Sequence, residues 1–257
     1  MEWNKKTFVI ITGASKGIGR TIAVEFSKRV AAGSKFILLA RSASGLEESK
    51  SLCSPDVVVE TLTANLESPD AQKIKNFIAE AAANPDDYER AVIVHNAGSL
   101  GNLQRSAKDF EDLDEINNYF NLNVGSMILL NTMFLKAFPK SEKYKRLVIN
   151  ITSLCGIKPF QGFALYCTGK ATREMFLKVL ALEEPTVKVL NYSPGPVLTD
   201  MADEILAGLK CHELRKPFED LRTNGSYLTP EDTIGKLIQL LESGNFESGD
   251  HVDVFDI

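Results

Sequence analysis

Residues 8–20 are FVIITGASKGIGR, an apolar run that leads into three glycines within seven positions. The run Phe8–Thr12 has the length and β-branched content of a buried strand, and the apolar spacing of Ile18–Val30 is typical of a helix. Glycines between a strand and a helix permit a sharp turn and let backbone N–H groups approach a phosphate. We therefore expect a turn that binds the pyrophosphate of a dinucleotide. The expected contacts are Gly13, Ala14, Ser15, Lys16, Gly17, Ile18 and Gly19.

The same alternation of strand and helix patterns continues along the chain. Further strand-like runs are Phe36–Arg41, Val57–Leu66, Ala91–His95, Leu147–Thr152, Val187–Tyr192 and His251–Phe255. Helix-like stretches between them are Pro69–Ala83, Ile116–Phe138 and Ala164–Glu183. This order predicts the α/β class: one Rossmann-type domain over residues 1–257, with a doubly wound parallel sheet of about seven strands and helices on both faces.

One segment interrupts the alternation. After Pro194-Gly195, about fifty residues with scattered Gly and Pro precede the last strand. They could be one or two surface helices. Ligands of doubly wound sheets bind beyond the carboxyl ends of the strands, so we favour a substrate lid over residues 196–246.

Composition excludes several classes of function. The net charge of −5 and the lack of a basic run argue against nucleic-acid binding. No apolar stretch reaches the roughly 18 residues of a membrane span, and residues 1–6 hold no apolar signal core, so we expect a cytoplasmic protein without membrane contact. The four cysteines are scattered and only three histidines occur, so we expect free thiols and no metal site.

The end of the second predicted strand indicates the type of dinucleotide. Residues 39–42 are Leu-Ala-Arg-Ser, without the carboxylate that an NAD site would direct at the ribose 2′-hydroxyl. Arg41 can instead pair with a 2′-phosphate, as can Lys16 in the glycine turn. The alternative is that both are solvated surface cations, but together with the missing acid they favour NADP(H).

Four residues form a candidate catalytic set. Tyr166 and Lys170 lie four apart in a helical stretch and so share one helix face. Ser153 follows the fifth predicted strand, and Asn123 lies within the predicted helix Ile116–Phe138. A phenol, with its ordinary pKa of about 10, can protonate the alkoxide formed when hydride reaches a carbonyl, and a nearby ammonium is expected to lower that pKa. A serine hydroxyl can orient the carbonyl oxygen.

These motifs together resemble the short-chain dehydrogenase/reductase family along the whole chain. The matching elements are Thr12-Gly-x-x-x-Gly-x-Gly19, Asn96-Ala97-Gly98, Asn123, Ser153, Tyr166-x-x-x-Lys170 and Pro194-Gly195-x-x-x-Thr199. Beside the glycine turn, the resemblance implies cofactor contacts from Arg41, Ser42, Asn65, Leu66, Asn96, Ala97, Gly98, Tyr166, Lys170, Pro194, Gly195, Val197, Leu198, Thr199, Asp200 and Met201.

Six segments narrow the resemblance to a branch of the family that reduces side-chain carbonyls of pterins in tetrahydrobiopterin formation. They are 95–101, 153–155, 164–170, 180–185, 190–196 and 248–253. This resemblance implies NADPH as reductant, a homodimer, and an aspartate, Asp253, that anchors the pterin through two parallel N–H bonds. The implied substrate contacts are Ser153, Leu154, Phe163, Tyr166, Gly195 and Asp253.

The sequence also permits other interpretations. Asp253 could be a solvated acid, and Leu154 and Phe163 could be core residues. His95, Asn65 and Thr152 depart from the family pattern, which puts cofactor affinity more in doubt than chemistry. The chain could also be a broad carbonyl or diketone reductase, or a nucleotide-sensing binding protein, although the complete catalytic set argues against the last.

Overall fold

Seven parallel strands form one sheet in the order β3-β2-β1-β4-β5-β6-β7, in a computed structural model that describes residues 1–257. Every neighbouring pair is parallel, so the predicted Rossmann-type fold is confirmed. The order reverses between β1 and β4, and a crevice for a ligand opens at such a point. The strands are β1 Thr7–Thr12, β2 Lys35–Ala40, β3 Val58–Thr63, β4 Arg90–His95, β5 Lys145–Ile151, β6 Val187–Ser193 and β7 His251–Asp253.

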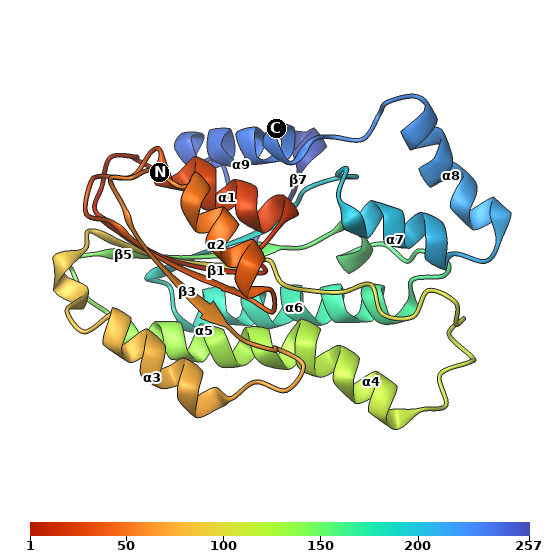
Figure 1. Ribbon diagram of the computed structural model, residues 1–257, viewed down its shortest axis with the longest axis horizontal. Coiled ribbons are helices and arrows are strands. Elements are labelled where there is room, and N and C mark those ends of the chain that lie inside the picture. The colour runs from red at the N-terminus through yellow and green to blue at the C-terminus, as the bar shows by residue number, and fades with distance from the viewer.

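Helices cover both faces of this sheet (Figure 1). One layer contains α1 Gly17–Ser27, α2 Ala43–Leu52 and α9 Pro230–Ser243. The opposite layer contains α3 Ala71–Ala81, α5 Ser126–Ala137 and α6 Ala164–Glu183. Alternate residues of the central strands enter the two apolar cores, which is why these strands are apolar without a polar face.

Local chemistry explains where the predicted helices differ from the observed ones. The stretch predicted as one helix from Ile116 is α4 Leu113–Phe120, a π-helical turn Asn121–Gly125, and then α5. Helix α2 has no counterpart among the predicted helices, because only Leu46 and Ser49 are buried and its apolar periodicity is weak. Its start is nevertheless marked by Ser42, whose side chain accepts a hydrogen bond from Gly45 N.

The segment 196–246, predicted as a lid, divides into two parts. Helices α7 Asp200–Gly208 and α8 His212–Thr223 stand beyond the carboxyl ends of the strands (Figure 1). Helix α9 begins with a capping box at Thr229 and buries Ile234, Leu237 and Leu241 in the core. The part of the segment placed to cover a ligand is therefore α7 and α8, and α9 belongs to the sheet's helical layer.

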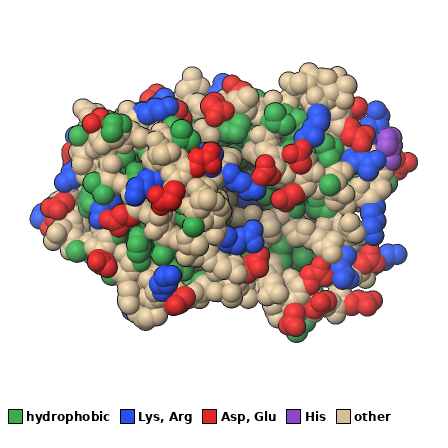
Figure 2. Space-filling view, in the orientation of Figure 1, with side chains coloured by type: hydrophobic (Ala, Val, Ile, Leu, Met, Phe, Trp, Pro, Cys, Tyr) green, Lys and Arg blue, Asp and Glu red, His purple; other side chains and the backbone are tan.

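The surface shows charges of both signs interspersed over the face drawn in Figure 2. No helix has the length and apolarity that a membrane span requires.

Helix α6 is attached to the sheet by a buried arginine. Arg173 is 1% exposed, and its guanidinium donates hydrogen bonds to Asn150 Oδ1 (2.9 Å) and to the carbonyls of Ala97 (3.0 Å), Asn123 (2.9 Å) and His95 (2.6 Å). Burial is the main reason why the pKa of Arg173 falls to about 10. At that value the Arg173 side chain stays charged at neutral pH. Its guanidinium therefore joins α6 to the ends of β4 and β5.

We expect Arg173→Met to lower the free energy of unfolding by at least about 3 kcal/mol, since each buried acceptor left without a donor costs roughly 1–3 kcal/mol. Urea denaturation measures this loss. Arg215→Met, on the surface of α8, removes only a partly exposed ion pair and should cost less than about 1 kcal/mol. A loss below 1 kcal/mol in Arg173→Met would show that the network does not hold α6.

Candidate active site

The glycine turn forms the cradle expected from its sequence. An added Cβ at Gly19 would lie 2.3 Å from Gly13 O, so only glycine permits this approach of α1 to the turn. Asn96 secures the turn, because its Nδ2 donates to the carbonyls of Thr12 and Gly13, both at 3.1 Å. Helix α1 starts at Gly17 with no side-chain cap and no acidic residue in its first turn. Its first N–H groups can therefore bind an anion, and the cradle fits a dinucleotide pyrophosphate.

The two predicted 2′-phosphate ligands lie on the surface near this turn. Arg41 follows β2 and forms an ion pair with Glu67 (3.4 Å), while Lys16 pairs with Asp200 at the start of α7. Both cations are more than half exposed, and exposed ion pairs of this kind contribute little energy. Arg41 and Lys16 can therefore each leave the carboxylate partner and pair with a cofactor phosphate instead.

Asn65 shapes the loop after β3. Its Oδ1 accepts a hydrogen bond from Glu67 N (3.1 Å), and Leu66 beside it is buried. This departure from the family pattern therefore has a local role in the turn that carries Glu67.

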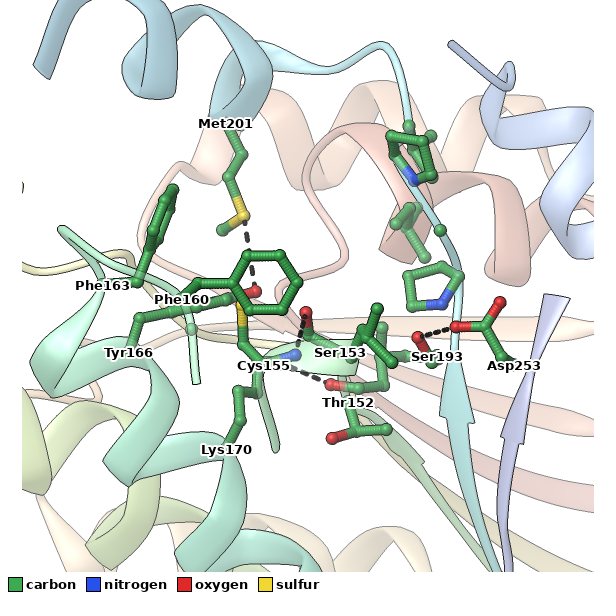
Figure 3. Close-up of a pocket in the computed structure, with 18 of the residues that line it drawn as sticks. Thr152, Ser153, Cys155, Phe160, Phe163, Tyr166, Lys170, Ser193, Met201 and Asp253 are labelled. Carbon is green, nitrogen blue, oxygen red and sulfur yellow. Dashed lines mark hydrogen bonds between the residues drawn. The ribbon is translucent and has the colours of Figure 1, made fainter. Parts of the chain in front are cut away.

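A cavity of about 600 Å³ opens at the carboxyl ends of the strands (Figure 3). It brings together fourteen of the predicted site residues: Ile18, Asn96, Gly98, Ser153, Leu154, Phe163, Tyr166, Lys170, Pro194, Gly195, Val197, Thr199, Met201 and Asp253. Several other residues also line the cavity although no sequence motif indicates them, among them Cys155, Phe160, Ser193, Phe218 and His251. His251 could have been found, because it lies two residues before Asp253 on a strand and so shares its face.

Ser153, Tyr166 and Lys170 each retain a donor for a ligand. Ser153 Oγ accepts a hydrogen bond from Cys155 N (3.2 Å), which leaves its own hydrogen free. Lys170 Nζ donates to Ile151 O (2.7 Å) and lies 5.5 Å from the centre of the Tyr166 ring. The Tyr166 hydroxyl contacts the weak acceptor Met201 Sδ at 4.0 Å, and the side chain of Ser153 lies close enough to favour its ionised form. The phenolic proton is thus available in the cavity.

Burial controls the ionisation of these groups. It raises the pKa of Tyr166, and the neighbouring Cys155 adds to the effect. Burial, followed by the charge of Arg173, lowers the pKa of Lys170 well below its usual value. From the sequence, Lys170 is expected to lower the pKa of Tyr166. In the folded chain burial is the largest cause and outweighs the hydrogen bond with Ser153 and the charge of Arg173, so the pKa of Tyr166 rises and the phenol keeps its proton.

Asn123 lies behind the cavity rather than in its wall. Its Oδ1 accepts a hydrogen bond from Ser99 N (2.9 Å), and its Nδ2 donates to Tyr119 O (2.9 Å). Its own carbonyl accepts from Arg173. The structure gives Asn123 a positioning role at the π-helical turn, and its direct part in catalysis stays a prediction.

Asp253 lies at the end of β7 and lines the cavity (Figure 3). Its Oδ2 accepts a hydrogen bond from Ser193 Oγ (2.6 Å) and its Oδ1 accepts from Phe255 N (3.1 Å). A carboxylate has about four acceptor positions, so both oxygens can still accept from a ligand. Gly195, with φ of 73°, packs beside this segment, where an added Cβ would lie 2.7 Å from Val254 Cγ1.

Comparison with known proteins agrees with this geometry. A family model described as "short chain dehydrogenase" matches residues 7–210. Sepiapterin reductase of Meriones unguiculatus is 38% identical over 250 residues, covering 96% of this chain and 95% of that protein. Benzil reductase ((S)-benzoin forming) of Bacillus subtilis (strain 168) is 30% identical over 251 residues, covering 95% of this chain and 97% of that one. The crystal structure of the KRED1-Pglu enzyme superposes with a TM-score of 0.81 at 27% identity, covering 96% and 100% of the two chains.

We expect Tyr166→Phe to lower turnover of a dicarbonyl by about 10²–10⁴-fold, because the phenolic proton is needed only as the alkoxide forms. Binding of the nicotinamide cofactor, measured by fluorescence titration, should change little. Tyr144→Phe removes a hydroxyl that bonds Pro139 O away from the cavity and serves as the control. Retention of more than half of the turnover in Tyr166→Phe would contradict this role.

Proposed function

This chain belongs to the short-chain dehydrogenase family and is an oxidoreductase of carbonyl and CH–OH groups, and we propose that it reduces side-chain carbonyls of a pterin with NADPH. Sepiapterin and 6-pyruvoyl-tetrahydropterin are the proposed substrates, in tetrahydrobiopterin formation. The observation that carries the proposal is Asp253, a carboxylate in the same cavity as Ser153 and Tyr166. The similarity to sepiapterin reductases supports it.

Different residues around the cavity bind the carbonyl oxygen, protonate it and hold the cofactor. The nicotinamide cofactor, when bound, supplies the hydride. Ser153 donates its free hydrogen to the carbonyl oxygen and orients it, and Tyr166 gives its proton to the same oxygen as negative charge develops there. Lys170 Nζ donates one hydrogen to Ile151 O and has at least one more to donate to the cofactor ribose. Met201, from α7, closes the cavity over the Tyr166 hydroxyl.

A broader diketone reductase is the second candidate. The wall opposite Asp253 is apolar and contains Phe160, Phe163 and Phe218, which suit an aryl ketone as well as a flat heterocycle. The similarity to benzil reductase favours this alternative. The two candidates differ in whether Asp253 contributes to binding.

We also propose that the chain forms a homodimer, as the family resemblance implies. Met175, Val179 and Leu182 of α6 follow one another at helical spacing and are 63%, 43% and 82% exposed. An apolar stripe of this kind on a helix is typical of a surface that a partner covers. A cytoplasmic location stays a prediction from the sequence.

Replacing the cation of Arg41 by a carboxylate tests the preference for NADPH over NADH. Arg41→Asp should weaken NADPH binding and favour NADH, because it removes a cation from the 2′-phosphate and offers a carboxylate to a 2′-hydroxyl. Titration of both cofactors into each protein gives the ratio of dissociation constants. Lys50→Asp, at the far end of α2, controls for the change in net charge. If the ratio is the same in Arg41→Asp and wild type, Arg41 does not select the cofactor.

Asp253→Asn tests the pterin assignment. A charge-assisted hydrogen bond contributes roughly 1.5–3 kcal/mol, so its loss should reduce kcat/KM for sepiapterin about tenfold or more. A small diketone lacks the 2-amino-pyrimidinone edge, and its kcat/KM should change little.

Asp250→Asn is the matched control, since its carboxylate bonds Glu247 N outside the cavity. Equal losses on both substrates would make Asp253 structural, and no loss on either would make it a surface acid. Either result would rule out the pterin assignment and favour the diketone reductase.

A further inference from the structure

A buried carboxylate, Glu174, lies close to the cavity residue His251. Glu174 is on α6, one turn after Lys170, and its side chain is 3% exposed. Its Oε1 accepts a hydrogen bond from Thr152 Oγ1 (2.5 Å) and contacts His251 Nδ1 at 2.9 Å. The reduction steps described above use neither Glu174 nor His251.

The contact with Glu174 places a hydrogen on Nδ1 of the His251 ring. An ionised carboxylate can only accept, so Nδ1 carries the hydrogen and donates it to Glu174. In the neutral ring Nε2 is then an acceptor. Nε2 is buried and has no partner within the protein, although the side chain is 10% exposed and lines the cavity. A buried acceptor without a donor is costly, which makes this nitrogen a site for a ligand hydrogen.

Neighbouring groups do not supply that hydrogen. Asn191 lies opposite His251 in the register of β6 and β7, but its amide nitrogen donates to Gly249 O (3.1 Å) and its oxygen accepts from Asn150 (2.9 Å). Arg173 gives its hydrogen bonds to other acceptors. Since His251 lines the cavity, a ligand bound there can supply the hydrogen.

Residue spacing places this acceptor with the proposed pterin anchor. His251 and Asp253 are two apart on β7 and so lie on the same face of the sheet. Ser193 is opposite Asp253 and hydrogen-bonded to it, which confirms that this face is the one lined by the cavity. The strand therefore presents two acceptors in a row, a carboxylate and an imidazole nitrogen.

We propose that His251, oriented by Glu174, is a specificity-determining residue that accepts an N–H of the substrate's heterocycle beside Asp253. The proposal rests on the proposed function, because the 2-amino-pyrimidinone edge of a pterin supplies adjacent N–H donors. Glu174 is the positioning residue: it sets the tautomer of the ring and holds its plane.

Two substitutions of His251 separate ligand binding from a structural role. The amide of His251→Asn reaches the place of Nδ1, so it can still donate to Glu174 but offers nothing at Nε2. The longer amide of His251→Gln reaches the place of Nε2 and can accept there. We expect His251→Asn to lower kcat/KM for sepiapterin about tenfold, mainly through KM, with little change for a small diketone. His251→Gln should recover most of the sepiapterin activity.

Melting temperatures of both variants and activity on both substrates complete the test. If His251 only satisfies Glu174, His251→Asn will resemble wild type, whereas His251→Gln will melt earlier and lose both activities equally, and the proposal is overturned. If the wild-type enzyme reduces sepiapterin and His251→Asn loses no more activity on sepiapterin than on the diketone, the proposal for His251 is overturned and the proposed function stands. A wild-type enzyme inactive on sepiapterin but active on the diketone overturns the proposed function, and with it the substrate assigned to His251.

Discussion

The guanidinium of Arg173 is the contact on which the active site depends. It is buried without a carboxylate partner and donates to four neutral acceptors at the ends of β4 and β5 and at the π-helical turn. Charge-assisted hydrogen bonds are stronger than neutral ones, and a charge left unpaired in the interior is costly. The position of α6 against the sheet is therefore closely constrained. Since α6 also carries Tyr166 and Lys170, that constraint sets the places of these two side chains in the cavity.

The same helix face carries four ionisable groups. Tyr166, Lys170, Arg173 and Glu174 recur at helical spacing and are all buried against the sheet. Their shared burial opposes ionisation, which keeps Tyr166 protonated and lowers the pKa of Lys170. Glu174 offsets part of the effect on Lys170. Burial of this face thus keeps the proton on Tyr166, which suits its proposed role as proton donor.

Strand β7 gives the cavity a polar edge. It is only three residues long and lies at the margin of the sheet, yet it places His251 and Asp253 on the cavity side. The other walls come from aromatic residues and from α7, with Met201 above Tyr166 (Figure 3). An apolar slot with acceptors at one edge suits a flat ring with N–H groups along one side.

The sequence by itself determined the sheet, the glycine turn and the place of the candidate proton donor and its lysine on one helix. These features depend on local pattern: apolar runs of strand length, glycines at fixed offsets, and Tyr166 and Lys170 four apart on one helix. The sequence does not predict helix α2, because this helix buries little apolar surface. It places α9 in the predicted lid with α7 and α8, because all three fall in the long segment between the last two strands. Only the tertiary structure decided that Asn123 lies behind the cavity, that burial raises the pKa of Tyr166, and that Glu174 meets His251 across 77 residues. Burial and long-range hydrogen bonds arise from the packing of α6 on the sheet, and no spacing along the chain encodes them.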